Sequence, residues 1–305
     1  MSYEASMLAK WHMPSRERVA DVLLQVLLEH HGVIKEFNSD SEVVDKIAAK
    51  CGVSDAQRNV YLETIYRKEN RLKRTSLWHR LIFRAATELA NRGWVTRPTQ
   101  TARISGNREW MLTENGFDAA LKASSISLGR KDELAVRSYE VQKIVKELVS
   151  VTAPIDYDPV DRTKKKTRVT QETILRFRGF RQAVIEAYDF RCSLCMLRIP
   201  SPDALRWEVQ AAHIVPNYFQ GRDDVCNGVA LCHLHHWAFD VGWFTITCDY
   251  KLRVSAAWRK NSRASEETIE RLGLRKRVEL EMPTRRHLLP HPNALQWHHK
   301  NVFHP

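Results

Sequence analysis

The sequence lacks any apolar run that approaches the roughly 20 residues needed to cross a bilayer. Its first residues, MSYEASMLAKWHMPSRE, also lack the basic patch followed by an apolar stretch that a secretory signal shows. Internal repeats and low-complexity segments are absent too. These absences argue against a membrane span and against export, and they predict a cytoplasmic protein.

Cysteine is scarce, with six residues in a chain of 305. Thiols stay reduced inside the cell, and a chain of this length can bury a sufficient core, so a disulfide framework is not expected. Cys51, Cys226 and Cys248 have no close partner with metal-ligand spacing, and we expect them to be small apolar residues. The other three cysteines are clustered, which indicates metal binding.

Acidic residues are outnumbered: 36 Asp and Glu stand against 48 Lys and Arg, which gives a formal net charge of +12 and a pI near 9.5. Such a balance attracts polyanions, so nucleic acid is the leading class of partner. An ordinary basic soluble protein would have the same charge, and motifs must decide between the two. The length exceeds that of a usual single domain and predicts two domains.

The first 122 residues are predicted to form helices followed by a two-stranded hairpin. Residues 15–31 repeat apolar positions with helical spacing and end at Gly32, and residues 41–52 and 75–93 follow the same plan. Residues 53–66 are expected to form a further helical stretch. Residues 94–122 predict two short strands around a polar, basic loop, and then a final helical turn.

Helices followed by a two-stranded wing describe a winged helix, whose last helix before the wing normally enters the major groove of DNA. With "LANRGWV" and "REWMLTENGFDAAL", residues 14–122 resemble the N-terminal winged-helix domain of Mrr-type and related restriction enzymes. The resemblance implies a DNA-reading domain over residues 1–122. Five candidate DNA-binding residues precede or open the expected recognition helix: Arg71, Lys73, Arg74, His79 and Arg80. The alternative for them is a solvated helix face.

Residues 123–170 are predicted to be a helical and basic linker. The segment RKDELAVRSYEVQKIVKELVS is strongly charged with an apolar seam, which indicates a connecting helix. The stretch that follows carries Pro154, Pro159 and the run Lys164 to Lys166, and it predicts an irregular segment. The lysine run is either a solvated linker or a contact to the DNA backbone.

Two pairs of soft ligands follow with the same two-residue gap. Cys192 and Cys195 form a Cys-x-x-Cys turn, and 37 residues beyond Cys195 stands Cys232-His-Leu-His235. Zinc takes four Cys or His ligands, and an x-x gap lets both members of a pair bend toward one ion. The spacing therefore predicts one structural zinc site, while His233, between the ligand positions, is expected at the surface.

The stretches "AAHIVP", "NG" and "LCHLHHWAFDVGWF" resemble the HNH endonuclease signature, specifically that of bacterial restriction enzymes. His213, Asn227 and His236 occupy the three positions that give the motif its name. The likeness spans residues 172–303, from "AYDFRCSLC" to "LPHPNALQWHHKNVF". It implies a zinc-stabilised ββα-metal nuclease domain over residues 171–305, and an α+β protein in which a helical linker joins it to the winged helix.

Phosphodiester hydrolysis needs a deprotonated water in line with the leaving oxygen and a cation that holds the added negative charge. His213, near the end of an alternating apolar segment, is predicted to be the general base. His236 and Asp240 are four residues apart, so on a helix they lie on one face and can share Mg²⁺ or Mn²⁺. Asn227 is predicted to pin its loop and orient the His213 ring, or to be a turn residue before Gly228.

One position departs from the pattern that the resemblance implies. Many relatives carry Asp or His immediately before the first catalytic histidine as a metal ligand, and here that residue is Ala212. The departure makes Asp240 more important, and it leaves open whether His213 also binds the ion.

The combined pattern predicts a metal-dependent endonuclease of restriction type that cuts duplex DNA and recognises sequence or base modification through the winged helix. One HNH site cleaves one strand, so a homodimer is expected. Two alternatives remain: a non-catalytic, zinc-containing DNA-binding regulator, and an RNA-directed nuclease. The late histidines His298 and His299 lack ligand spacing with a second pair, and we expect packing or contact with the DNA backbone for them.

Overall fold

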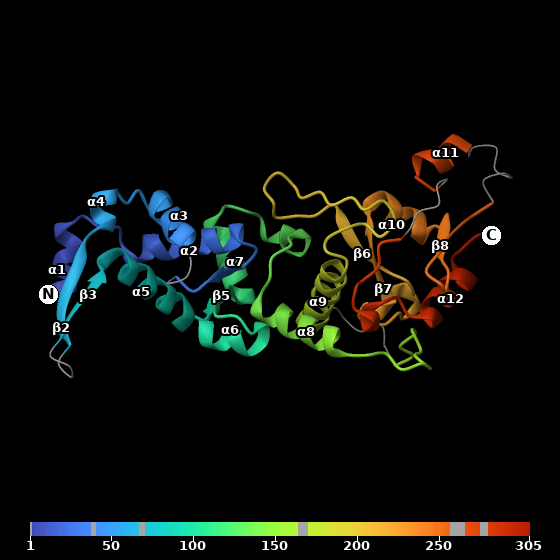
Figure 1. The fold of residues 1–305 in the computed structure, drawn as a ribbon, viewed down its shortest axis with the longest axis horizontal. Helices are drawn as coiled ribbons and strands as arrows, with labels where there is room; N and C mark the ends of the chain where they lie inside the picture. The colour runs from blue at the N-terminus through green and yellow to red at the C-terminus, as the bar shows by residue number, and fades with distance from the viewer. Residues whose placement is uncertain (1, 38–40, 67–70, 164–169, 257–265, 275–279) are drawn as a thin grey trace. The chain divides into compact units, whose positions relative to one another are not determined.

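The computed structural model describes residues 2–37, 41–66, 71–163, 170–256, 266–274 and 280–305 (Figure 1). The chain divides into two compact units, Met1–Gln142 and Lys143–Pro305. The division falls within helix α8 (Tyr139–Ser150), in the segment for which the sequence predicts a connecting helix. Each unit is a mixture of helices and short antiparallel sheets and is described by itself.

The N-terminal unit is built around α2 (Arg16–Glu29), which packs against α3, α5 and α7. Ser15 caps α2 by accepting a hydrogen bond from the backbone of Arg18, and eight of the 14 helix residues are buried. The remaining helices of this unit are α1 (Tyr3–Lys10), α3 (Ser41–Cys51), α4 (Asp55–Arg58), α5 (Leu77–Asn91), α6 (Pro98–Ser105) and α7 (Glu114–Ala123).

A three-stranded antiparallel sheet closes the N-terminal unit, in the order β1 (Val33–Lys35), β5 (Glu109–Leu112), β4 (Val95–Thr96). Ile34 pairs with Trp110, and Val95 pairs with Leu112. The two strands predicted within residues 94–122 are therefore present as β4 and β5. The predicted helices over residues 15–31, 41–52 and 75–93 are confirmed as α2, α3 and α5.

Two predictions for this unit are wrong in part. Residues 53–66 are helical only over α4, and they continue as β2 (Tyr61–Tyr66), which pairs with β3 (Arg71–Ser76). The aromatic and β-branched residues of YLETIY favour a strand. The predicted loop after β4 contains α6, which begins at Pro98 and ends before Gly106, whose φ is 78°. Proline at the first turn and a left-handed glycine after the last turn delimit a short helix.

The C-terminal unit has an antiparallel hairpin of β6 (Val209–His213) and β7 (Gly228–Cys232), followed directly by α10 (His233–Asp240). Helix α9 (Gln171–Ala187) packs on both strands. At Gly228 this packing is so close that a Cβ would lie 2.4 Å from Val184. The other elements are β8 (Phe244–Ile246) paired with β9 (Leu252–Val254), α11 (Glu266–Arg271) and α12 (Pro292–Asn301).

The segment after α8 is irregular over residues 151–163, as predicted, but it belongs to the C-terminal unit and packs within it. Tyr157 is buried, and its hydroxyl donates a hydrogen bond to Asp224. The backbone of Pro159 accepts a hydrogen bond from Arg222, and Val160 pairs with Gly221. The lysine run Lys164 to Lys166 lies outside the described residues.

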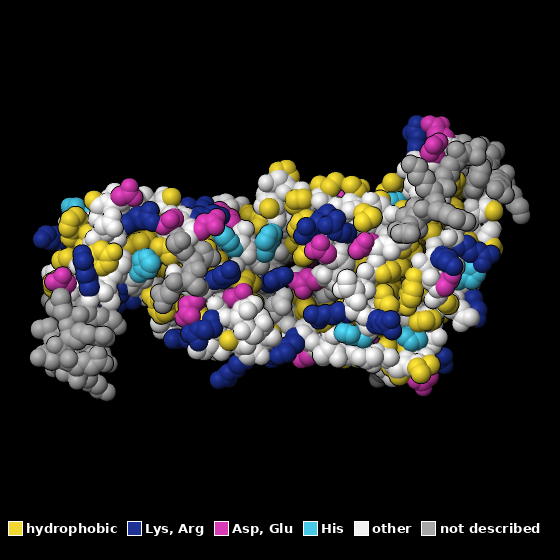
Figure 2. All heavy atoms as spheres, viewed as in Figure 1, with side chains coloured by type: hydrophobic (Ala, Val, Ile, Leu, Met, Phe, Trp, Pro, Cys, Tyr) yellow, Lys and Arg dark blue, Asp and Glu magenta, His cyan; other side chains and the backbone are white. Residues whose placement is uncertain are grey.

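The described surface carries charges of both signs. Figure 2 shows Lys and Arg side chains spread over the visible face of each unit, interspersed with Asp and Glu. Among the described residues, no helix is both long enough and apolar enough to cross a membrane.

Candidate functional site

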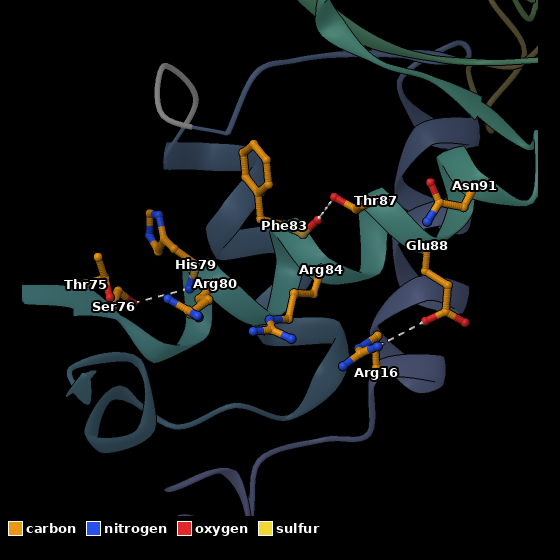
Figure 3. A pocket seen from close by; sticks show the side chains of 10 residues that line it. All are labelled: Arg16, Thr75, Ser76, His79, Arg80, Phe83, Arg84, Thr87, Glu88 and Asn91. Carbon is orange, nitrogen blue, oxygen red and sulfur yellow. Dashed lines mark hydrogen bonds and ion pairs between the residues drawn. The ribbon is translucent and has the colours of Figure 1, made fainter. Parts of the chain in front are cut away.

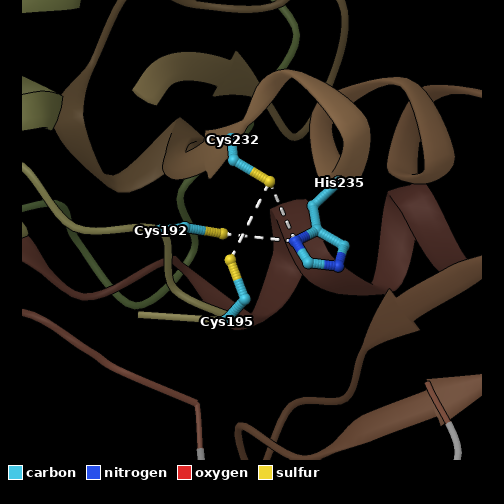
Figure 4. Close-up of side chains that lie close together, drawn as sticks. All are labelled: Cys192, Cys195, Cys232 and His235. Carbon is cyan, nitrogen blue, oxygen red and sulfur yellow. Dashed lines mark hydrogen bonds between the residues drawn. The ribbon is translucent and has the colours of Figure 1, made fainter. Parts of the chain in front are cut away.

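A cluster of three cysteines and one histidine lies where the turn after α9 meets the start of α10 (Figure 4). Cys192 and Cys195 come from the turn, Cys232 ends β7, and His235 lies in the first turn of α10. Their ligand atoms all lie within 4.8 Å of one another. The sequence spacing thus brings both predicted pairs to one place.

The distances within the cluster fit a tetrahedral zinc site. Nδ1 of His235 lies 3.0 Å from Sγ of Cys232 and 3.4 Å from Sγ of Cys192, and the sulfurs of Cys195 and Cys232 are 3.9 Å apart. Ligands at about 2.3 Å from one ion would be about 3.8 Å apart in a regular tetrahedron. Nε2 of His235 lies 2.9 Å from the backbone oxygen of Leu272, which orients the ring.

The thiols of the cluster and the ring of His235 affect one another's protonation. Contact with Cys192 raises the pKa of the Cys232 thiol to about 11, because gathered sulfurs resist a second negative charge. Burial lowers the pKa of His235, but contacts with Cys192 and Cys195 outweigh burial and raise this pKa to about 10. A zinc ion would release these protons and hold the thiolates, so the donor set fits zinc.

Neighbouring His236 lies in a different environment. Its Nδ1 is 2.7 Å from Oε1 of Gln210 on β6, and its Nε2 is 3.4 Å from a carboxylate oxygen of Asp240. Residues 233–240 are helical as α10, so the expected one-face arrangement of His236 and Asp240 is present. Side-chain exposures of 24% for His236 and 50% for Asp240 leave this pair open to solvent.

The charges of this pair are adjusted by their surroundings. Burial lowers the pKa of His236, and the positive forms of His213 and His233 lower it further, whereas Asp240 raises it. Burial raises the pKa of Asp240, against the effect of His236 and His213. Burial thus disfavours the charged form of each group, and a bound divalent cation would favour the carboxylate form of Asp240.

His213, the last residue of β6, is held on its ring face and at its ring edge. The ring stacks on Phe180 of α9, with centroids 4.0 Å apart and planes at 19°. Nε2 lies 3.0 Å from Oδ1 of Asp223. His213 is also close enough to affect the charges of His236 and Asp240, so these three predicted site residues lie in one region.

Asn227 is fully buried and fixes the loop between β6 and β7. Its Oδ1 accepts a hydrogen bond from the backbone of Val215, and its Nδ2 donates to the backbone oxygens of Val215 and Arg222. Its own backbone oxygen binds Ile214, next to His213. The pinned loop agrees with the prediction for Asn227, whereas the His213 ring is bonded to Asp223 instead.

The sequence reasoning missed Asp223 as a site residue. It lies in the acidic pair Asp223–Asp224, four residues before Asn227, inside the stretch that matches the HNH pattern. An acidic side chain near the motif asparagine was the available signal. His233 is exposed, as expected, and its Nδ1 lies 2.8 Å from the backbone oxygen of Glu208.

The two candidate metal sites differ in completeness. Among the residues that the structure describes, no second group of three or more His, Cys, Asp or Glu ligand atoms lies within 4.8 Å of one another. The pair of His236 and Asp240 would thus hold an ion with only two side chains. Water and substrate phosphate would complete the coordination shell, as suits Mg²⁺ or Mn²⁺.

The cysteines outside the cluster differ from one another. Cys226 is buried and Cys51 is partly buried, in line with the expected apolar role. Cys248 is exposed, so the expectation is wrong for this residue.

In the N-terminal unit, a cavity of about 920 Å³ runs along α5 (Figure 3). Its lining includes His79, Arg80, Phe83 and Arg84. His79 is exposed, while Arg80 and Arg84 each lie 2.6 Å from the carboxylate of Glu4 in α1. The hollow therefore combines basic groups with the partly exposed ring of Phe83.

The other predicted DNA-binding residues lie on β3. The guanidinium of Arg74 lies 4.2 Å from the ring centroid of Tyr61 on the paired strand. Arg71 and Lys73 lie on the same strand, and their side chains are outside the described part of the structure.

Comparison with known proteins identifies the nuclease segment. Residues 192–247 match the family model described as HNH endonuclease. This segment contains the cysteine and histidine cluster together with His213, Asn227, His236 and Asp240. The match covers less than half of the chain, so it identifies an HNH endonuclease domain and does not assign the whole chain to a family.

No curated protein matches the sequence. A solved structure, a modification-dependent TagI restriction endonuclease, is 22% identical and is matched over 40% of this chain and 37% of that chain, with a TM-score of 0.30. The matched region thus spans less than two thirds of that chain. At this TM-score, the likeness supports no conclusion about fold or function.

Proposed function

We propose that the protein is a metal-dependent DNA endonuclease of restriction type, whose C-terminal unit hydrolyses phosphodiester bonds. The observation that carries the proposal is the divergence of two adjacent histidines within an HNH segment. His235 lies among three thiols, and His236 lies beside Asp240 in the region of His213.

In the proposed reaction, His213 takes a proton from the attacking water and His236 and Asp240 hold a divalent ion. When bound, the ion stabilises the extra negative charge on the phosphorus oxygens. Asn227 keeps the loop that follows His213 in place through its three side-chain hydrogen bonds. The zinc ligands are Cys192, Cys195, Cys232 and His235. With zinc bound, they would stabilise the turn and the helix on which the site is built.

The test is incubation of supercoiled plasmid with purified protein and Mg²⁺ or Mn²⁺, with His213→Ala as the paired variant. The proposal expects nicked or linear DNA with wild-type protein and a loss of about a hundredfold to ten-thousandfold with the variant. Specific DNA binding without cleavage by either metal would contradict it and favour a DNA-binding regulator. Preferential cleavage of structured RNA would favour an RNA-directed nuclease.

We further propose that the N-terminal unit reads duplex DNA as a winged helix, with α5 as its recognition helix and β4 and β5 as its wing. The exposed positions of Arg74 and His79 and the arginines in the lining of the cavity along α5 support this role. Arg71, Lys73 and Arg80 complete the proposed surface. Digestion of unmodified and methylated DNAs, with the ends sequenced, would show whether sequence or base modification is read.

We also propose a homodimer on DNA, because one HNH site cuts one strand. Sedimentation of the His213→Ala protein with a duplex should give a complex of two chains per cleavable site. A single chain per site, with only nicked product from the wild type, would contradict the dimer.

A further inference from the structure

The ring of His213, the proposed general base, lies beside a carboxylate from a distant position in the sequence. Ala212 precedes His213, yet Oδ1 of Asp223 lies 3.0 Å from Nε2 of the His213 ring. We propose that Asp223 is a positioning residue that orients the imidazole and fixes its tautomer, so that Nδ1 takes the proton from water. This inference rests on the proposed nuclease function and deepens it.

The tautomer follows from the donor and acceptor chemistry of the pair. A neutral imidazole has one N–H, and an ionised carboxylate can only accept a hydrogen bond. Nε2 of His213 must therefore carry the hydrogen toward Asp223, which leaves the lone pair on Nδ1. The side chains are 10% and 16% exposed, so water competes weakly for this bond.

The step balances through the same pair. An O–H bond of water breaks, an N–H bond forms at Nδ1, and the oxygen lone pair attacks phosphorus. The bond from phosphorus to the leaving oxygen breaks as the new bond forms, and the leaving oxygen takes a proton from solvent water. The positive imidazolium then faces the Asp223 carboxylate, which stabilises it. Asp223 does not touch the reacting atoms and acts through His213.

The loop that carries Asp223 is fixed from two sides. On the inner side, Nδ2 of Asn227 donates to the backbone oxygen of Arg222, the residue before Asp223. On the outer side, the backbone N–H of Arg222 donates to Pro159, and its Nε donates to Asp158. Such anchoring holds a carboxylate in place without the ordering cost of a free loop.

The His213 ring also has little freedom to turn. Its face stacks on Phe180 at 4.0 Å between centroids, and Phe177 lies nearly parallel at 6.4 Å. Stacking fixes the ring plane, but it does not distinguish one ring nitrogen from the other. The contact with Asp223 supplies that distinction.

The chain offers a matched control at the next residue. Asp224 is also acidic and belongs to the same loop, but its carboxylate accepts a hydrogen bond from the hydroxyl of Tyr157 at 3.2 Å. Asp223→Asn and Asp224→Asn make the same chemical change at adjacent positions. The first alters the hydrogen-bond partner of His213, and the second alters that of Tyr157.

The experiment measures single-turnover cleavage of plasmid and DNA binding without metal for both variants. Asp223→Asn should reduce the cleavage rate about 10- to 100-fold with DNA affinity unchanged. Its acid limb in the pH–rate profile should move to lower pH, because the protonated ring loses a neighbouring negative charge. Asp224→Asn should cut at nearly the wild-type rate. Equal losses in both variants, with no movement of the acid limb, would overturn the proposal.

A second readout does not depend on cleavage. Nitrogen NMR of ¹⁵N-histidine protein, with the His213 signals assigned through His213→Gln, reports which ring nitrogen carries hydrogen. The wild type should hold the Nε2–H form, and Asp223→Ala should give a mixture of the two forms. The same tautomer in both proteins would overturn the proposal. Absence of cleavage by wild-type protein would instead contradict the nuclease function.

Discussion

Two adjacent histidines of α10 lie in different surroundings. His235 is 4% exposed and faces a closed set of sulfurs, whereas the next residue, His236, has a side chain 24% exposed beside Asp240 and Gln210. A closed set of four donors leaves an ion no position for substrate, and a pair of ligands leaves several. Ligand number and exposure therefore distinguish the proposed structural site from the proposed catalytic one.

The comparison also predicts that stability and activity can be lost separately. The cluster ties the turn at Cys192 to the end of β7 and to α10, so its loss removes a connection between elements. In the open region, His213 ends β6, Asp240 ends α10, and His236 lies within α10 without belonging to the cluster.

Cys192→Ala should unfold much of the C-terminal unit. The variant would lose zinc binding that contributes on the order of 10 kcal/mol in small zinc domains. Zinc content by mass spectrometry and thermal unfolding by circular dichroism measure the two consequences. A variant that lost zinc and kept the wild-type melting temperature would show that the cluster is not structural.

His213→Ala should abolish most cleavage and leave the fold intact. The expected loss of a hundredfold to ten-thousandfold corresponds to about 3 to 5 kcal/mol of transition-state stabilisation. Zinc content and melting temperature should stay near wild-type values. A large fall in melting temperature would show instead that His213 stabilises the fold.

Asn227→Ala should affect both properties, because its side chain holds the loop on which the reactive region depends. The change leaves the backbone groups of Val215 and Arg222 without their buried partner, at a cost of about 3 kcal/mol. Denaturant unfolding and plasmid cleavage should fall together. Lost cleavage at unchanged stability would contradict a loop-holding role.

His298 is a buried histidine that belongs to neither candidate metal site. It is 1% exposed, stacks on Phe239, and bonds Thr245 and the backbone oxygen of Phe239. The sequence left packing or contact with the DNA backbone open for His298, and these contacts give it a packing role. Burial lowers the pKa of His298 to about 4 from the usual 6.5, so the folded state binds its proton less readily than the unfolded state.

The contribution of neutral His298 to the free energy of unfolding is complete above pH 6.5 and falls as the pH drops from 6.5 toward 4. At pH 5.5 the loss should be about 1.4 kcal/mol. Urea unfolding at pH 7.5 and pH 5.5 should show this loss in wild type and a smaller one in His298→Gln. Equal losses would assign the acid sensitivity to other groups.

Local patterns in the sequence were enough to predict the helices α2, α3 and α5, the hairpin strands and the gathering of four soft ligands. Helical spacing and x-x gaps act over a few residues, so one chain suffices to read them. The pairing of β2 with β3 was missed because both strands have a mixed composition, and each forms as a strand only when paired with the other. The contact between Asp223 and His213 was missed because nine residues separate them in the sequence, and only the fold of that loop brings them together.

The most direct test of the account is the metal content of His236→Ala beside that of His235→Ala. Atomic emission would measure zinc, and electron paramagnetic resonance would measure added Mn²⁺. We expect His236→Ala to keep one zinc and to lose Mn²⁺ binding, and His235→Ala to lose zinc. A His236→Ala protein that lost its zinc, or that bound Mn²⁺ as tightly as the wild type, would contradict the assignment of adjacent histidines to different ions.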